Sequence, residues 1–247
     1  MTCEACRTIP PVTSQGYTPK GQYETIAGLK TYVTGNPEAR IGLVDIYDVF
    51  GLSNQTLQGA DLLATRLNAV VLVPDFFEGD ALEHHNIPPD TDEKKQRIGQ
   101  FLATRANIER NTGVVLAAVP EYRTRFPLVA KWGANGLCWG GKVTILASGS
   151  NTPFAASSQV HPGLLDPADA QFVSIPHMVL ASKDEEADKV AAYAPLVAPK
   201  SGVVETYSSM WHGWMGARAN LENEESRAEY VRGRYAQLAD FFEKHLA

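Results

Sequence analysis

Cys138 lies in a glycine-rich segment whose spacing could support nucleophilic chemistry. Residues 136–140 read Gly-Leu-Cys-Trp-Gly, which fits the pattern G-x-S-x-G with cysteine in the position of serine. In that pattern a strand turns sharply into a helix, and the small residues leave room for the tight backbone. The thiol then lies at a helix N-terminus, where the helix dipole favours the thiolate. The spacing predicts a nucleophilic cysteine, while a cysteine that only packs in a tight turn is the alternative.

An acid and a histidine follow Cys138 later in the chain. Asp184 follows one predicted strand, and His212 follows the next predicted strand after a short loop. The carboxyl ends of parallel strands meet at one edge of a sheet, so these side chains are expected to lie near the thiol. Nucleophile, acid, histidine is also the chain order of the α/β-hydrolases. We therefore expect a triad of Cys138, His212 and Asp184.

The acid and the histidine each have an alternative interpretation. Asp184 belongs to the acidic run of residues 183–188, which could be the solvated first turn of a helix, with carboxylates placed favourably against its dipole. Asp184 is preferred because it is nearest to the end of the strand, and Glu185 is the reserve. His212 lies among aromatic residues and could be a packed histidine, but its loop before the final helix favours the role of base.

Two further polar residues follow predicted strands at the same edge. Asp48 comes directly after an apolar strand and could be a turn residue or a group that assists the thiol. His161 ends its strand before Pro162, so it could line the pocket or only cap the strand. Both are therefore candidates for substrate binding or thiol activation.

The elements that must position these residues alternate between strand and helix. Apolar runs bounded by Gly and Pro predict strands, and apolar residues at helical spacing predict helices. The predicted strands cover residues 22–26, 30–33, 40–47, 69–74, 131–137, 154–161, 176–182 and 203–207, and the predicted helices cover 57–68, 92–119, 185–193 and 222–245, with another directly after Cys138. This alternation implies right-handed crossovers and a mostly parallel sheet with helices on both faces.

The first two predicted strands form an antiparallel hairpin around residues 27–28. Together with the order of the motifs, this pattern predicts an α/β-hydrolase fold with an N-terminal antiparallel hairpin. With 247 residues and 44% apolar content, the chain is expected to form one domain over residues 1–247, in which residues 1–20 are an extended segment.

Charge and cysteine content argue against several classes of protein. A net charge of −6 and a pI near 5.5 argue against nucleic-acid binding, which needs a concentrated basic face. The N-terminus lacks the pattern of a signal peptide, and no segment approaches the run of about 18 apolar residues that a membrane span needs. Three cysteines make no disulfide framework. We expect a soluble cytoplasmic protein with no metal, cofactor, nucleic-acid or membrane partner; the oligomeric state stays open.

Five motifs together make the chain resemble the dienelactone hydrolase family, in particular its fungal members that begin with a short Cys-x-x-Cys segment. The motifs are Cys-Glu-Ala-Cys at residues 3–6, Tyr-Asp-Val-Phe-Gly at 47–51, Pro-Asp-Phe-Phe-Glu-Gly at 74–79, Gly-Leu-Cys-Trp-Gly-Gly-Lys at 136–142 and His-Gly-Trp at 212–214. The resemblance runs from Cys3 to the last helix. It implies the α/β-hydrolase fold, with Cys138 as nucleophile, His212 as base and Asp184 as the acid that orients it.

The resemblance also implies roles for residues around the reacting centre. The backbone N–H groups of Trp139 and Val49 would hold the oxyanion. In the bacterial members a glutamate at the position of Asp48 takes part in generating the thiolate. The side chain of Asp48 is one methylene shorter than that glutamate. In the bacterial pattern an arginine shortly after the histidine holds a substrate carboxylate. The corresponding candidate here is Arg218, which lies somewhat farther beyond the histidine. Trp214 is expected to contact substrate.

These inferences predict a cysteine-dependent hydrolase that acts on small ester or lactone substrates through an acyl-enzyme. Thiolates attack unactivated amides poorly, so esters, lactones and thioesters are favoured over peptides. Two alternatives remain open: a hydrolase-fold protein that binds a ligand in a tryptophan-lined pocket without turnover, and a thioesterase-type biosynthetic hydrolase. Cys3 and Cys6 could form a redox pair or half of a zinc site, although an inert terminus is favoured.

Overall fold

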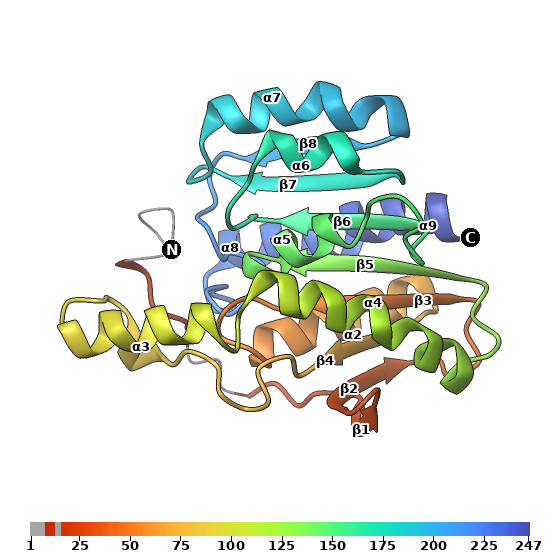
Figure 1. Ribbon diagram of the computed structural model, residues 1–247, viewed down its shortest axis with the longest axis horizontal. Helices are drawn as coiled ribbons and strands as arrows, with labels where there is room; N and C mark the ends of the chain where they lie inside the picture. Colours follow the sequence, from red (N-terminus) through yellow and green to blue (C-terminus); the bar gives the residue numbers. More distant parts are fainter. Residues whose placement is uncertain (1–7, 13–15) are drawn as a thin grey trace.

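The computed structural model describes residues 8–12 and 16–247. In these residues an eight-stranded sheet has the order β1-β2-β4-β3-β5-β6-β7-β8 (Figure 1). β1 pairs with β2 and β2 with β4 in antiparallel fashion, whereas all other neighbours are parallel. The strands are β1 (Gln22–Ile26), β2 (Leu29–Gly35), β3 (Ile41–Ile46), β4 (Val70–Pro74), β5 (Lys131–Leu137), β6 (Ala156–Val160), β7 (His177–Ser182) and β8 (Val203–Tyr207). The mostly parallel sheet and the N-terminal hairpin confirm the sequence prediction.

Helices cover both faces of this sheet. They are α2 (Asn54–Leu67), α3 (Asp92–Ala103), α4 (Ile108–Arg125), α5 (Trp139–Leu146), α6 (Pro167–Phe172), α7 (Ala187–Val197), α8 (Glu224–Val231) and α9 (Ala239–Leu246), with 3-10 turns η1 (His84–Asn86) and η2 (Ala198–Lys200) and the π-helical segment η3 (Arg232–Leu238). Helices α4, α5, α6 and α7 pack on one face, and α2, η3 and α9 pack on the other (Figure 1). No helix in residues 8–12 or 16–247 is both long and apolar enough to span a membrane.

The helix predicted over residues 92–119 is two helices, α3 and α4. The chain leaves helical geometry at Thr104, and the side chain of Asn107 accepts the N–H of Arg110 and so starts α4. The Asn111 side chain donates to the carbonyl of Arg105 and fixes the connection between the helices. Apolar spacing continued across this break, but an asparagine that caps a helix sets a new N-terminus. As a result α3 projects from the sheet (Figure 1).

The final helical region contains a buried ion pair that anchors the site loop. Arg234 of η3 pairs with Asp45 of β3 at 2.9 Å, and both side chains are fully buried. Asp45 also accepts from Asn135 at 2.5 Å, and Asn135 accepts from Ser158 at 2.7 Å, so the network crosses three neighbouring strands. Arg234 donates further to the carbonyl of Met215 at 3.2 Å, which lies three residues beyond His212. The π-helical segment therefore links the sheet to the loop that carries His212.

His177 forms a buried polar network at the beginning of β7. The Gln159 amide donates to His177 Nε2 at 3.0 Å and to the Tyr193 hydroxyl at 2.8 Å. With Nε2 accepting, Nδ1–H of His177 donates to Ser157 Oγ at 2.7 Å. Burial lowers the pKa of His177 to about 3, so the ring is neutral near pH 7. Both ring nitrogens of this structural histidine have partners.

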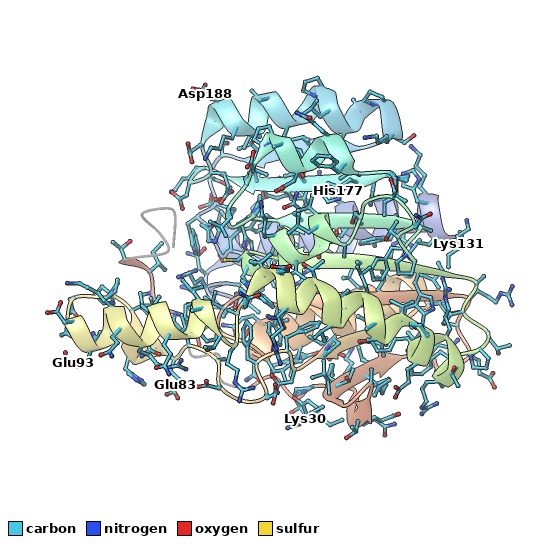
Figure 2. All side chains as sticks on the ribbon, in the orientation of Figure 1. Lys30, Glu83, Glu93, Lys131, His177 and Asp188 are labelled. Atoms are coloured by element: carbon cyan, nitrogen blue, oxygen red, sulfur yellow. The ribbon has the colours of Figure 1, made fainter. Side chains whose placement is uncertain are left out.

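The parallel strands end at one edge of the sheet. Figure 2 labels Lys131, which begins β5, and Asp188, which opens α7 beyond the end of β7, and the two lie at opposite sides of the view. Residues 8–12, drawn in red in Figure 1, lie at the side of the view where Figure 2 labels Asp188. In open α/β sheets ligands bind outside the carboxyl ends of the strands, so this edge is the place to look for a site.

Candidate active site

Cys138 forms a strained turn between β5 and α5. Its backbone has φ 52° and ψ −111°, and the helix begins at the next residue. A positive φ in a residue other than glycine costs about 1–3 kcal/mol and persists only where the surroundings enforce it. Here Cys138 N donates to Val160 O at 3.0 Å, and its carbonyl accepts from Gly141 and Gly163 at 3.1 and 2.9 Å. Three main-chain bonds thus hold the thiol at the start of a helix.

Two glycines of the motif are required by close backbone contacts. A Cβ at Gly136 would lie 2.1 Å from the carbonyl oxygen of Gly140, and a Cβ at Gly140 would lie 2.1 Å from that of Ile46. A side chain at Gly136 would push the start of α5 away from β5, and one at Gly140 would push it away from the end of β3. The G-x-C-x-G spacing therefore allows the turn at Cys138 to pack against the end of β3.

Two neighbouring carboxylates hold His212 in different ways. His212 Nδ1 lies 2.6 Å from Glu185 Oε1, and both side chains are almost completely buried. Asp184 Oδ2 instead accepts the backbone N–H of His212 at 2.8 Å. The carboxylate that contacts the imidazole is therefore that of Glu185, whereas the sequence predicted that of Asp184. The reason is a turn in which Asp184 N donates to Ser182 Oγ and Glu185 accepts the N–H of Ser182, which points the second carboxylate inward.

Val49 and Trp139 carry the amides expected to form an oxyanion hole. Among the described residues, no hydrogen bond uses the backbone N–H of either one. The Val49 carbonyl accepts from Leu82 at 3.0 Å, which fixes the orientation of the loop after β3. The Trp139 indole donates to Ala106 O at 2.8 Å and packs 4.7 Å from the ring of Phe77, so the start of α5 is firmly anchored.

Asp48 joins the loop after β3 to the loop of His212. Its carboxylate is fully buried and accepts the backbone N–H of Phe50 at 2.9 Å and of Ala217 at 2.8 Å. Burial raises the pKa of Asp48, and those two backbone donors and the charges of Arg218 and His212 oppose the shift. These contacts make Asp48 a turn residue that joins two site loops, and its role in substrate binding or thiol activation stays a prediction.

Arg218 is buried against the beginning of the chain. Its Nε donates to the carbonyl of Ile9, and its guanidinium lies 4.8 Å from the centre of the Phe50 ring. Val12 N donates to Ala217 O at 2.8 Å, which adds a second bond between the same segments. We call residues 9–12 the N-terminal strap. The Arg218 guanidinium, expected to face a substrate carboxylate, thus donates to main chain of the strap. No sequence pattern indicates this pairing.

The remaining two expected site residues, Trp214 and His161, are both buried. Trp214 is fully buried and packs on Tyr207 with ring centroids 4.2 Å apart, which places it in the core beneath the loop. His161 is also fully buried, and its ring centroid lies 5.1 Å from that of His212 in an edge-to-face arrangement. Of the two, His161 is the one in contact with the candidate base.

A cavity of about 410 Å³ opens beside His212. This volume lies within the range of small-molecule sites, about 300–1,000 Å³. Its lining combines carboxylates, two lysines and apolar residues of the loop after β6: Lys142, Pro162, Leu164, Leu165, Asp166, Asp184, Glu185, Glu186, Lys189 and His212. Across the described ranges, no group of three or more His, Cys, Asp or Glu side chains is arranged to hold a metal ion. Cys3 and Cys6 lie outside those ranges.

Comparison with known proteins places this site in a family. The profile of the dienelactone hydrolase family matches residues 29–246. The chain belongs to the dienelactone hydrolase family. Two proteins of Schizosaccharomyces pombe, both named as uncharacterized AIM2 family proteins, are similar over nearly their whole length. One is 35% identical over 235 residues, 93% of each chain, and the other is 33% identical over 251 residues, 99% of each.

Solved structures of the dienelactone hydrolase type share the fold. A putative dienelactone hydrolase of Klebsiella pneumoniae gives a TM-score of 0.63 at 16% identity, over 93% of this chain and 97% of that one. The dienelactone hydrolase-like promiscuous phosphotriesterase P91 from metagenomic libraries gives 0.63 at 18% identity, over 93% and 99%. These similarities confirm the predicted α/β-hydrolase fold, and the family match over residues 29–246 confirms the predicted family.

Proposed function

We propose that the protein hydrolyses small esters or lactones through a covalent intermediate on Cys138. The observation that carries the proposal is the strained cysteine at a helix N-terminus, at the same sheet edge as a buried His212–Glu185 pair 2.6 Å apart. A nucleophile on a strained turn and a base oriented by a carboxylate are the parts that acyl transfer requires. The family and the hydrolase fold support the same chemistry.

The reaction follows from the roles of these groups. His212 takes the proton of the Cys138 thiol, and the thiolate attacks the carbonyl carbon of the substrate. The amides of Val49 and Trp139 hold the resulting oxyanion. The carbon–oxygen bond then breaks, the leaving alkoxide takes the proton from His212, and a thioester remains. His212 then takes a proton from water, and the water oxygen attacks the carbon of the thioester. The carbon–sulfur bond breaks, His212 returns the proton to the leaving thiolate, and the acid product leaves.

Glu185 sets the tautomer of the base. A carboxylate that accepts from Nδ1–H keeps the proton on that nitrogen, so Nε2 is the nitrogen available to accept the proton of the thiol. The same carboxylate stabilises the imidazolium that forms during the reaction. The proposed triad is therefore Cys138, His212 and Glu185, with Asp184 holding the backbone of the histidine.

A single substitution tests the proposal. The parent is expected to hydrolyse p-nitrophenyl acetate, and Cys138→Ala is expected to lower kcat by about 1,000-fold or more, because the nucleophile is lost. The double variant Cys3→Ser, Cys6→Ser is the matched control, since it leaves Cys138 as the one cysteine of the chain. It should keep parental activity and lose that activity on treatment with iodoacetamide.

The substrate class is tested in the same assay with enol-lactones and acyl thioesters beside the aryl ester. Turnover of esters and lactones above thioesters is the expected order. Equal rates for the parent and Cys138→Ala would overturn the proposed nucleophile. A parent that binds these compounds in the cavity but turns none of them over would overturn the proposed function in favour of a binding protein.

A further inference from the structure

His161 is a second buried histidine that the proposed mechanism leaves without a role. It directly follows Val160, whose carbonyl accepts the N–H of Cys138 at 3.0 Å. The backbone of His161 therefore lies beside the turn at Cys138. Its ring meets that of His212 edge to face, with centroids 5.1 Å apart and planes at 65°. His161 therefore adjoins both the candidate nucleophile and the candidate base.

The conformation of His161 is unfavourable in three ways. The backbone has φ 36°, in the left-handed region that favours glycine. The side chain is fully buried, and within the described part of the chain neither ring nitrogen has a hydrogen-bond partner. A phenylalanine would fill a similar space without leaving polar atoms unsatisfied. Buried polar groups nearly always have partners, so two unsatisfied nitrogens beside a candidate site indicate a partner from outside the chain.

The neutral ring of His161 can donate a hydrogen bond but does not act as an acid. Burial lowers the pKa of His161 well below its ordinary value, and the charges of His212, Arg234 and Arg218 act in the same direction. A neutral imidazole has one N–H donor and one acceptor nitrogen. Neutral buried imidazoles can polarise an oxygen of a substrate by donating a hydrogen bond to it.

Two neighbours of this ring line the cavity. Pro162, the residue after His161, and His212, the residue that the ring packs on, both line the cavity of about 410 Å³. The ring itself is covered in this structure, so contact with a ligand requires it or the turn at Pro162 and Gly163 to shift toward the cavity. The oxygen that departs with the leaving group is the substrate atom that must lie near His212, because His212 protonates it.

We propose that His161 contacts the substrate and donates an N–H hydrogen bond to the leaving oxygen of the ester, on the opposite side from the proton supplied by His212. The inference rests on the proposed function and adds a residue to it. The leaving oxygen gains negative charge as its bond to carbon breaks, so this hydrogen bond strengthens in the transition state and accelerates acylation. Its effect is largest for poor leaving groups, which carry the most charge.

The test compares acetate esters that share one acyl group and differ in the leaving group. For each ester kcat/KM reports the steps through acylation. His161→Phe is expected to lower kcat/KM for ethyl acetate by about 10- to 100-fold and for p-nitrophenyl acetate by less than about 3-fold, because nitrophenolate needs little stabilisation. The variant should also melt at a higher temperature than the parent, since it removes unsatisfied polar atoms.

Two further variants keep the inference falsifiable. His161→Gln retains an N–H donor and is expected to show a weaker dependence on the leaving group than His161→Phe. His177→Phe changes the partnered histidine and should leave the dependence as in the parent. Equal loss for all esters, or no loss, in His161→Phe overturns the role of His161 while leaving the proposed function standing. A dependence on the leaving group as strong in His161→Gln as in His161→Phe overturns it in the same way. Failure of Cys138→Ala to lose activity would overturn the proposed function instead.

Discussion

The two fully buried histidines at the ends of adjacent strands differ in what surrounds their nitrogens. His177 begins β7, and the side chains of Ser157 and Gln159 satisfy both of its ring nitrogens. His161 follows β6 at the opposite edge of the sheet, and neither of its ring nitrogens has a partner in the described residues. Burial lowers the pKa of both. The two rings share a charge state and differ in hydrogen bonding.

This difference separates a region that stabilises the fold from the region of the proposed active site, which we call the reactive region. Where a buried polar ring only supports the fold, the surrounding side chains complete its hydrogen bonds, because each unsatisfied group costs about 1–3 kcal/mol. At the carboxyl edge of the sheet the strained Cys138 and the strained His161 lie in neighbouring segments. Strain and unsatisfied groups that occur together are typical of a site that awaits a ligand.

The largest effect is expected at the carboxylates of the reactive region. Glu185→Gln should lower kcat by about 1,000- to 10,000-fold, because an amide no longer enforces the reactive tautomer of His212. Asp184→Asn should lower it by less than about 10-fold, since its side-chain oxygen can still accept the backbone N–H. Ester hydrolysis by the two variants, with circular dichroism to verify the fold, checks this. The reverse order would restore Asp184 as the acid and contradict the assignment.

Substitution by phenylalanine is expected to act in opposite directions at the two histidines. His177→Phe should lower the free energy of unfolding by about 2 kcal/mol, because it leaves hydroxyl and amide groups of the network without their ring partner. His161→Phe should raise it by about 1–2 kcal/mol by removing two unsatisfied nitrogens. Urea unfolding at pH 7 measures both. Destabilisation of similar size in both variants would remove the distinction between the regions.

Acid should destabilise the fold through both rings. The folded-state pKa of His177, about 3, lies below the unfolded value of 6.5, so below pH 6.5 the unfolded chain binds more protons than the folded one. The free energy of unfolding therefore falls as pH falls through this range, by up to about 1.4 kcal/mol per pH unit for each such histidine. Between pH 7 and pH 5 the melting temperature should fall more steeply for the parent than for His161→Phe. An equal fall of melting temperature with pH in the two proteins would contradict a buried neutral His161.

The sequence predicted the parts of the site that depend on local spacing. Gly136 is required by a contact with the backbone of Gly140 nearby in the chain, and such a local contact leaves a short motif, whereas Gly140 is required by a contact with the distant Ile46. The alternation of strands and helices likewise predicted the parallel sheet, since each crossover is a local unit. His212 was found because it follows a strand, and its loop reaches the edge that the topology dictates.

Features that depend on side-chain direction could not be predicted in the same way. Whether Asp184 or Glu185 faces the imidazole is decided by a turn around Ser182, in which a shift of one residue exchanges the two carboxylates. The break before α4 depends on one capping side chain within otherwise continuous helical spacing. The ion pair between Asp45 and Arg234 joins positions 189 residues apart, and neither residue has a local pattern that identifies the other.

The N-terminal strap has a consequence for how the protein is made. Ile9 and Arg218 are 209 residues apart, so their contact cannot form until residue 218 has left the ribosome. Chains emerge N-terminal end first and local units fold early, so the cysteine turn can be complete while the histidine loop is still being synthesised. The turn at Cys138 can therefore form before the strap is joined to the loop that follows His212.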